Sequence, residues 1–164
     1  MNLRNNRPAL IAGAALLVAA AWFLRPAPHV TNLDSRGANI IAFGDSLTDG
    51  YGAGEGEDYP SRLQQRIGAT VLNAGLSGDT TDGALSRLDD DVLAQNPRIV
   101  IVGLGGNDFL RQVPIATTEA NLRTIVRRIQ GKGAMVVLLG FRFPAFNANY
   151  EAMYERVAKD EGCL

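Results

Sequence analysis

The sequence predicts an α/β fold of the three-layer α/β/α type, flavodoxin-like, in which helices cover both faces of a parallel sheet. Two observations support this class. Short runs that are apolar throughout alternate along the chain with segments whose apolar residues recur every three or four positions. Strands without polar alternation are buried on both faces, which is typical of parallel sheets flanked by helices. At 164 residues, the chain is long enough for one such domain.

Four apolar runs predict the strands. The first, Asn39 to Gly44, is rich in isoleucine and ends at a glycine, and the third is the most strand-like run in the chain. Apolar runs of four to eight residues bounded by turn residues fit buried strands. The predicted strands are residues 39–44, 69–75, 98–105 and 134–140.

Four helices are predicted from apolar residues that share one helical face. Pro60 is compatible with the first turn of the first helix, and Asn96-Pro97 ends the second. After the last helix, residues 160–164 have the pattern of a turn that leads into a fifth strand. The face residues are Tyr59, Leu63 and Ile67; Leu85, Leu88, Val92 and Leu93; Leu122, Ile125, Val126 and Ile129; and Tyr150, Met153, Tyr154 and Val157.

The first thirty residues predict a targeting or anchoring segment outside this fold. Arg4 and Arg7 precede an unbroken apolar stretch, Pro8 to Leu24, and no acidic residue precedes Thr31. An uncleaved signal anchor is favoured, with a cleaved signal peptide and a buried soluble helix as alternatives. In the first two cases the domain is exported. The predicted divisions are residues 1–30 for the signal anchor or signal peptide, 31–38 for a linker and 39–164 for the folded domain.

Composition and charge argue against several classes of function. Apolar residues make up 46% of the chain and charged residues 20%, as in ordinary globular domains. From Thr31 onward, 13 basic residues stand against 17 acidic ones, and no basic stripe with interleaved aromatic residues is present. Nucleic-acid binding is therefore not expected. Cys163 is the only cysteine, which excludes an internal disulfide and a cysteine-based zinc site.

Polar, glycine-rich loops follow the first three predicted strands. Ser46 lies in the first loop, Gly78 in the second and Asn107 in the third. Because the carboxyl ends of parallel strands meet at one edge of a sheet, we expect these loops at the same edge, where sites in α/β proteins lie. Singly, each has a structural interpretation: Ser46 and Asn107 suit turns, and the Gly78 loop suits a helix N-cap at Asp79 or Thr80. Together they indicate a nucleophilic hydroxyl beside hydrogen-bond donors.

The motifs in these loops resemble those of the GDSL/SGNH hydrolase family. The sequence "GDSL" at Gly44–Leu47 matches the family's first motif, "NAGLSG" at Asn73–Gly78 its glycine block, and "GGND" at Gly105–Asp108 its third block. The resemblance covers about residues 39–164 in the expected order and is closest to the bacterial thioesterase, lysophospholipase and arylesterase branch. It implies the SGNH hydrolase fold, with the last strand and helix missing from this chain.

The resemblance also implies roles for individual residues. Ser46 is expected to be the nucleophile, and the Ser46 N–H, the Gly78 N–H and the Asn107 side-chain amide are expected to form the oxyanion hole. Asp108 is expected to hold its loop by accepting backbone hydrogen bonds. The acidic cluster Asp89–Asp91 is expected to be a solvated helix face. Neither a metal ion nor a cofactor is implied.

The sequence departs from the family pattern at the fourth block, D-x-x-H, which supplies the catalytic histidine and the aspartate that orients it. No such block is present, and the only histidine, His29, precedes the domain. A general base must come within hydrogen-bonding reach of the serine. We therefore expect a truncated chain that is nearly inactive as given.

The leading function is hydrolysis of small carboxylic esters or thioesters, of the arylesterase, lysophospholipase or acyl-thioesterase type, through an acyl-enzyme on Ser46. Two alternatives remain open: a carbohydrate acetylesterase, and a non-catalytic envelope protein or inert fragment that keeps the fold. In a bacterium, the N-terminal segment is expected to place the protein in the periplasm or cell envelope, anchored in the inner membrane by residues 8–24.

Overall fold

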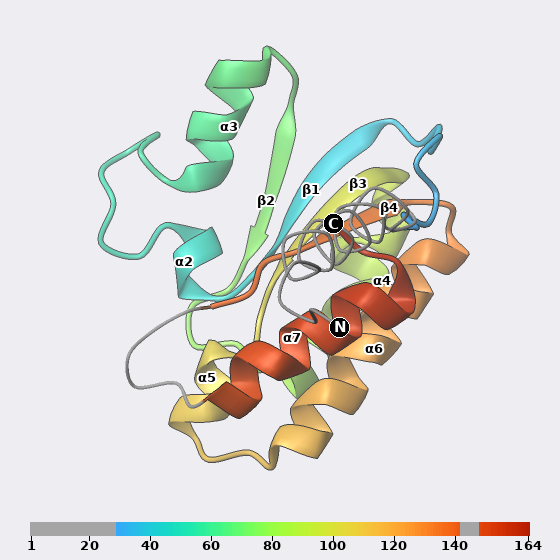
Figure 1. Cartoon of the computed structure of the whole chain (residues 1–164). Helices are drawn as coiled ribbons and strands as arrows, with labels where there is room; N and C mark the ends of the chain where they lie inside the picture. Colours follow the sequence, from blue (N-terminus) through green and yellow to red (C-terminus); the bar gives the residue numbers. More distant parts are fainter. Residues whose placement is uncertain (1–28, 142–147) are drawn as a thin grey trace, which may run out of the picture.

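The computed structural model of the chain describes residues 29–141 and 148–164. Within these residues, parallel strands alternate with helices (Figure 1). The strands are β1 (Asn39–Gly44), β2 (Val71–Gly75), β3 (Pro97–Gly103) and β4 (Met135–Leu138). The helices are α2 (Ser46–Asp49), α3 (Tyr59–Ile67), α4 (Thr81–Asp91), α5 (Gly106–Leu110), α6 (Ile115–Gly131) and α7 (Ala148–Glu161), with a 3-10 helix at Leu93–Gln95.

The sheet has the strand order β2-β1-β3-β4, and each neighbouring pair is parallel. In this register, Ala42 of β1 lies between Asn73 of β2 and Ile101 of β3. Because the strands run in one direction, the segments after β1, β2 and β3 leave the sheet at the same edge, and α2 and α5 lie there in Figure 1. The predicted α/β fold with a parallel sheet is therefore confirmed.

The hydrophobic core lies between the sheet and the helices α4, α6 and α7, which pack side by side. Alternate residues of the strands point into it, Ile41 and Phe43 from β1 and Val100 and Val102 from β3. The predicted apolar faces of these helices meet them, with Leu88, Leu122, Ile125, Val126, Ile129, Met153 and Val157 fully buried. Each such side chain contributes about 1.5–3 kcal/mol of hydrophobic free energy.

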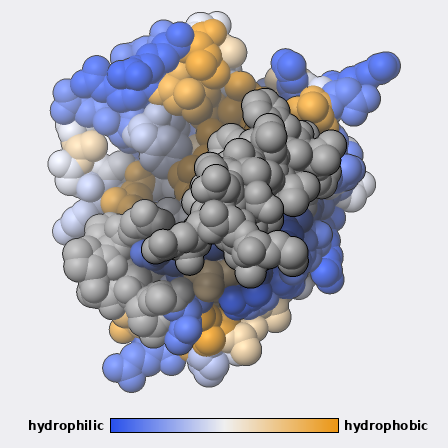
Figure 2. Space-filling model, in the orientation of Figure 1, coloured by the Kyte–Doolittle hydropathy of each residue, from blue (hydrophilic) through white to orange (hydrophobic). Residues whose placement is uncertain are grey.

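Helix α3 packs against the edge strand β2 and against α2. Figure 2 shows hydrophilic residues over the outer side of α3 and hydrophobic residues along β2 beside it. The helix begins at the cap Asp58, whose carboxylate accepts the Ser61 N–H at 2.8 Å, and Pro60 occupies its first turn as predicted. Asp58 thus satisfies a backbone N–H that lacks an intrahelical partner.

The predicted elements are present, with differences at their ends. Strand β1 has the predicted bounds. The ends of the other strands differ from the predicted ones by one or two residues, except for the end of β2 at Gly75, which is as predicted. Thr80 is the N-cap of α4, and its Oγ1 accepts the Gly83 N–H at 3.2 Å. The structure adds α2 and α5, which the sequence does not predict because helices of four or five residues show no apolar periodicity.

Leu164 pairs with the edge strand β4. Its N–H donates to the Val136 carbonyl oxygen at 3.1 Å, and its own carbonyl oxygen accepts the Leu138 N–H at 2.8 Å. Two such bonds, one on each side of Val137, are the pattern of a parallel ladder. The residues after α7 therefore enter the sheet beside β4, as the predicted turn into a fifth strand requires.

The predicted signal anchor or signal peptide, residues 1–30, lies outside the described residues except for its last two positions. In the ranges that the structure describes, no helix has both the length and the apolar character needed to span a membrane. The predicted linker, residues 31–38, contacts the ends of two helices. The Thr31 N–H donates to the Gly162 carbonyl oxygen at 2.9 Å, and Asn32 Nδ2 donates to the Gln130 carbonyl oxygen at 2.8 Å.

Candidate active site

Ser46 is the first residue of α2 and lies two residues beyond the end of β1. Asp45 caps this helix, because its Oδ1 accepts the Leu47 N–H at 3.1 Å, and the Asp45 N–H donates to the Gly103 carbonyl oxygen at 3.2 Å. The Ser46 side chain is half-buried, and no described residue hydrogen-bonds its hydroxyl or its N–H. Ser46 thus presents two unpaired polar groups at the edge of the sheet.

Two glycines allow α2 to lie directly on the strand ends. A Cβ at Gly44 would lie 2.1 Å from Thr48 Oγ1, and a Cβ at Gly75 would lie 2.1 Å from the backbone nitrogen of Asp49. Any other residue at either position would therefore push α2 away from the sheet. Asn73 Nδ2 donates to the Thr48 carbonyl oxygen at 2.9 Å and holds the helix against β2.

Gly78 lies in the loop after β2 with a φ of 81°, in the left-handed region that favours glycine. The Asp79 N–H donates to the Leu76 carbonyl oxygen at 3.0 Å and closes a turn around it. The Gly78 carbonyl oxygen accepts a hydrogen bond from Arg111 Nη2 at 2.8 Å, while no described residue accepts the Gly78 N–H. The loop therefore holds this N–H as a free donor.

Asn107 lies on α5, after β3, and its side chain connects the three loops. Its Nδ2 donates to the Asp79 carbonyl oxygen at 2.9 Å and lies 3.5 Å from Asp45 Oδ2. The second contact is too long for a strong hydrogen bond. One amide hydrogen is thus fixed, and the other is only weakly engaged. The structure brings the predicted residues Ser46, Gly78 and Asn107 to one edge of the sheet.

Asp108 accepts hydrogen bonds from the beginning of α4. Its Oδ2 accepts the Thr81 N–H at 2.9 Å, its Oδ1 accepts the Thr81 hydroxyl, and its side chain is almost completely buried. Thr118 Oγ1 approaches the same Oδ1 at 3.4 Å. These contacts match the expectation that Asp108 holds its loop, and they join the second and third loops.

The cluster Asp89–Asp91 is only partly the solvated face that the sequence predicts. Asp89 and Asp90 are exposed, but Asp91 is half-buried and accepts a hydrogen bond from Arg87 Nη1 at 2.8 Å. Within the described ranges, no three His, Cys, Asp or Glu side chains are placed to hold a metal ion.

Three carboxylates, those of Asp45, Asp79 and Asp108, lie near one another below the site. Burial raises the pKa of Asp45, and repulsion from the carboxylates of Asp79 and Asp108 raises it further, against the lowering effect of the Leu47 N–H. Asp45, the residue before Ser46, thus experiences a low dielectric and two like charges. A further negative charge that develops on a reacting group here would require hydrogen-bond donors to stabilise it.

His29 lies at the opposite end of the sheet from Ser46. A Cβ at Gly162 would lie 3.3 Å from His29 Nδ1. Gly162 is two residues before Leu164, which pairs midway along β4, so Gly162 is at the end where the strands begin. Ser46 is at the end where they finish. His29 therefore does not reach the Ser46 hydroxyl.

Three comparisons with known proteins agree with this geometry. The family model described as the GDSL-like lipase/acylhydrolase family matches residues 42–164. The chain belongs to the GDSL-like lipase/acylhydrolase family. It is 32% identical to esterase TesA of Pseudomonas aeruginosa over 124 residues, which cover 72% of this chain, and 34% identical to thioesterase 1/protease 1/lysophospholipase L1 of Escherichia coli K12 over 128 residues, 74% of this chain.

The crystal structure of AlinE4, an SGNH-hydrolase family esterase, has the same fold as this GDSL-family chain. The two superpose with a TM-score of 0.69 and 36% identity over 78% of this chain and 74% of AlinE4. The chain spans 62% of the length of each of the P. aeruginosa and E. coli relatives.

Three residues that support the site were not singled out from the sequence. Arg87 has the spacing of an ordinary helix residue, Arg111 directly follows α5, and the apolar periodicity of α7 explained Tyr154 as core. In the structure, the Tyr154 hydroxyl donates to the Leu104 carbonyl oxygen at 2.8 Å, one residue before the turn at Gly105. Burial raises the pKa of Tyr154, so it remains a donor near neutral pH.

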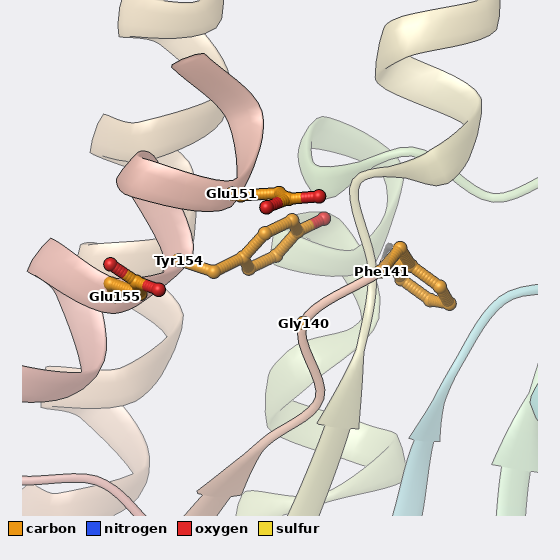
Figure 3. A pocket seen from close by; sticks show the side chains of 5 residues that line it. All are labelled: Gly140, Phe141, Glu151, Tyr154 and Glu155. Carbon is orange, nitrogen blue, oxygen red and sulfur yellow. The ribbon is translucent and has the colours of Figure 1, made fainter. Parts of the chain in front are cut away.

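Tyr154 also lines a small pocket between α7 and the segment after β4 (Figure 3). Its ring meets Phe141 edge-on, with ring centroids 6.1 Å apart. Glu151 and Glu155 complete the lining with Gly140. None of Ser46, Gly78 and Asn107 lines this pocket. Its one link to the candidate site is Tyr154, whose hydroxyl holds the backbone at the beginning of the third loop.

Proposed function

We propose that this GDSL-family chain carries the nucleophile and the oxyanion hole of a serine hydrolase that cleaves small carboxylic esters or thioesters through an acyl-enzyme on Ser46. The observation that carries the proposal is a set of groups at one edge of the sheet that no described residue engages strongly: the Ser46 hydroxyl, the Gly78 N–H and the second amide hydrogen of Asn107. The names of the relatives, esterase and thioesterase, support the same substrate class.

Each group has a defined task in this reaction. Ser46 Oγ forms a bond to the acyl carbon while a base takes the hydroxyl proton. The carbonyl electron pair moves onto oxygen, and the N–H groups of Ser46 and Gly78 and the amide of Asn107 donate to that oxyanion, each lowering the barrier by about 3–4 kcal/mol. The bond to the alcohol or thiol then breaks, and the leaving group takes the proton from the base. Water releases the acyl group by the same steps.

The general base is the group that the described residues do not bring to Ser46. His29, the only histidine of the sequence, lies at the far end of the sheet. Without a base, the Ser46 hydroxyl keeps its proton near neutral pH and reacts slowly. We therefore propose that this chain by itself is nearly inactive and that free imidazole, which mimics a histidine side chain, restores reaction at Ser46.

A fluorophosphonate probe tests this proposal. The Oγ–phosphorus bond forms, the phosphorus–fluorine bond breaks, fluoride leaves and imidazole takes the proton. Intact-mass and peptide mass spectrometry should find slow labelling of the chain alone and labelling at Ser46 at least about tenfold faster with imidazole on the order of 0.1 M. Ser46→Ala should abolish it. Labelling by mass is preferred to ester hydrolysis, since free imidazole attacks p-nitrophenyl esters directly. Absence of Ser46 labelling with imidazole contradicts the proposal.

We also propose that the N-terminal segment exports the domain to the periplasm or cell envelope of a bacterium, with residues 8–24 as an inner-membrane anchor. The supporting pattern is Arg4 and Arg7 before a long apolar run. Residues 1–40 fused to alkaline phosphatase should give an enzyme that is active outside the cytoplasm, and residues 31–40 alone should not. An inactive cytoplasmic fusion of residues 1–40 contradicts export, and a shortened membrane-free product favours a cleaved signal over the anchor.

A further inference from the structure

Arg87 places a largely buried guanidinium group beneath the candidate site. It lies on α4, its side chain is 17% exposed, and its carbon Cζ lies 4.4 Å from the centroid of the Phe43 ring. A guanidinium group stacked on an aromatic face and removed from water is held by its hydrogen-bond acceptors and by the ring together. The acceptors of Arg87 therefore indicate what this side chain fixes in place.

Two of these acceptors are backbone oxygens at the ends of strands. Arg87 Nη2 donates to the Gly44 carbonyl oxygen at 3.1 Å, and Nη1 donates to the Ala74 carbonyl oxygen at 2.9 Å. Gly44 is the last residue of β1 and lies two residues before Ser46. Arg87 thus joins the end of the nucleophile strand to the end of the strand that leads to Gly78.

A third acceptor belongs to the residue after Gly78, and the fourth is the carboxylate of Asp91 on the same helix as Arg87. Arg87 Nε donates to Asp79 Oδ2 at 2.8 Å, and the Asp79 side chain is only 5% exposed. Gly83 leaves the space for this carboxylate, because a Cβ there would lie 2.2 Å from Asp79 Oδ1. The Asp79 carbonyl oxygen in turn accepts the Asn107 amide. One carboxylate and one peptide therefore connect Arg87 to the donors of the second and third loops.

We infer that Arg87 is a positioning residue for acyl transfer: it fixes the separation between Ser46 and the N–H of Gly78 without touching the substrate. This inference rests on the proposed function. The planar guanidinium fork reaches Gly44, Ala74 and Asp79 in three directions at once. The ammonium group of a lysine donates from a single nitrogen and does not reproduce this geometry. A displacement of about 1 Å at a reacting group can lower a rate on the order of 10²-fold.

The test compares Arg87→Lys with a matched control in the full chain. Arg128→Lys makes the same chemical change in an ion pair with Asp89, on the exposed side of α4 and α6. Labelling of Ser46 by the fluorophosphonate is followed over a range of probe concentrations in imidazole. We expect Arg87→Lys to lower the maximal labelling rate on the order of 10²-fold, with the half-saturating probe concentration unchanged, and Arg128→Lys to leave both unchanged.

Amide NMR gives a readout that does not depend on labelling. In Arg87→Lys, the resonances of Gly78 and Asp79 should shift, while the amides of α6 and α7 keep their positions and thermal unfolding remains cooperative. If Arg87→Lys does not fold, Asp79→Asn removes the charged acceptor at nearly constant shape and should lower the labelling rate in the same way.

The outcomes separate the two proposals. A wild-type chain that imidazole does not activate at Ser46 contradicts the proposed function, and the Gly78 resonance then still decides whether Arg87 holds this loop. Labelling of Arg87→Lys at the wild-type maximal rate, with the Gly78 resonance unmoved, overturns the inference and leaves the proposed function standing. Equal losses in Arg87→Lys and Arg128→Lys, with general loss of amide dispersion, show a structural role only and also overturn it.

Discussion

The side-chain amide of Asn107 donates to the backbone carbonyl oxygen of Asp79 across 2.9 Å, although the two residues are 28 positions apart in the sequence. This bond uses one amide hydrogen and orients the other. An oxyanion hole needs donors that are fixed before the charge develops, because reorienting them during reaction costs free energy. The contact therefore converts a flexible side chain into a fixed donor one residue away from the Gly78 N–H.

Replacement of Asn107 by alanine should slow reaction at Ser46 while leaving probe binding intact. In the proposed reaction its amide stabilises charge that develops in the transition state, so we expect Asn107→Ala to lower the maximal phosphonylation rate about 10²–10³-fold in imidazole. The half-saturating probe concentration should change little. Asn121→Ala is the control, since it removes an amide that donates to the Thr81 hydroxyl behind the site at 3.1 Å. An unchanged rate in Asn107→Ala excludes this amide from the oxyanion hole.

Loss of the Asp108 carboxylate should destabilise the fold. Asp108→Ala leaves the buried N–H and hydroxyl of Thr81 without their acceptor, and an unsatisfied buried donor costs about 1–3 kcal/mol. We expect the free energy of unfolding from urea titration to fall by about 3 kcal/mol. Asp90→Ala removes an exposed carboxylate from α4 and should change it by less than about 0.5 kcal/mol. Equal effects of the two substitutions refute the role given to Asp108.

The raised pKa of Asp45 predicts a pH-dependent gain of stability in Asp45→Asn. A carboxyl group whose pKa is higher in the folded than in the unfolded state favours folding when protonated and costs stability once the pH exceeds the folded pKa. Asparagine carries no charge and keeps an oxygen for the Leu47 N–H. Asp45→Asn should therefore be more stable than the wild type near pH 7, and the difference should disappear as the pH falls below the ordinary aspartate pKa.

Thermal or urea unfolding at pH 7 and at a pH below the ordinary aspartate pKa of about 4 measures this difference. Asp49→Asn is the control, because Asp49 is exposed at the other end of α2. A gain of stability in Asp45→Asn that is the same at both pH values would show that the carboxylate charge is not its cause.

The lowered pKa of Glu161 predicts that the stability contributed by the contact between α7 and α6 has the opposite pH dependence. Its carboxylate accepts hydrogen bonds from Arg127 Nη2 at 2.7 Å and Arg123 Nη1 at 2.8 Å, and these arginines hold the pKa of Glu161 below its ordinary value. A depressed pKa contributes stability above the unfolded pKa, and this stability is lost as the pH falls through the folded pKa. Glu161→Gln should reduce the free energy of unfolding at pH 7 by about 1–2 kcal/mol.

The deficit of Glu161→Gln should shrink as the pH falls below the ordinary glutamate pKa and should disappear below the lowered pKa that Glu161 has in the folded protein, where both proteins lack the charge. Glu155→Gln, an exposed position on the same helix, should show no deficit at either pH. A deficit of Glu161→Gln that persists unchanged in acid contradicts an electrostatic role.

Much of the fold was predictable because its signals are local. The apolar run at β1 and the spacing of Leu122, Ile125 and Ile129 on α6 follow from backbone period and hydrophobicity, which act within a few residues. The order of the strands could not be predicted from such local signals, because parallel strands are joined through crossovers rather than tight turns. The approximate site was also predictable, because loops that follow parallel strands share one edge whatever their side chains.

The sequence by itself determined which residues are the candidates for the chemistry: Ser46, Gly78 and Asn107 stand out by residue type, by motif and by position after a strand. Only the tertiary structure decided what holds them in place. Two of the partners of Arg87 are backbone oxygens 43 and 13 residues away, and backbone oxygens have no signature in a sequence. The tertiary structure also decided the role of His29. A histidine in the sequence is a candidate base, but His29 lies at the other end of the sheet from Ser46 and cannot take its proton.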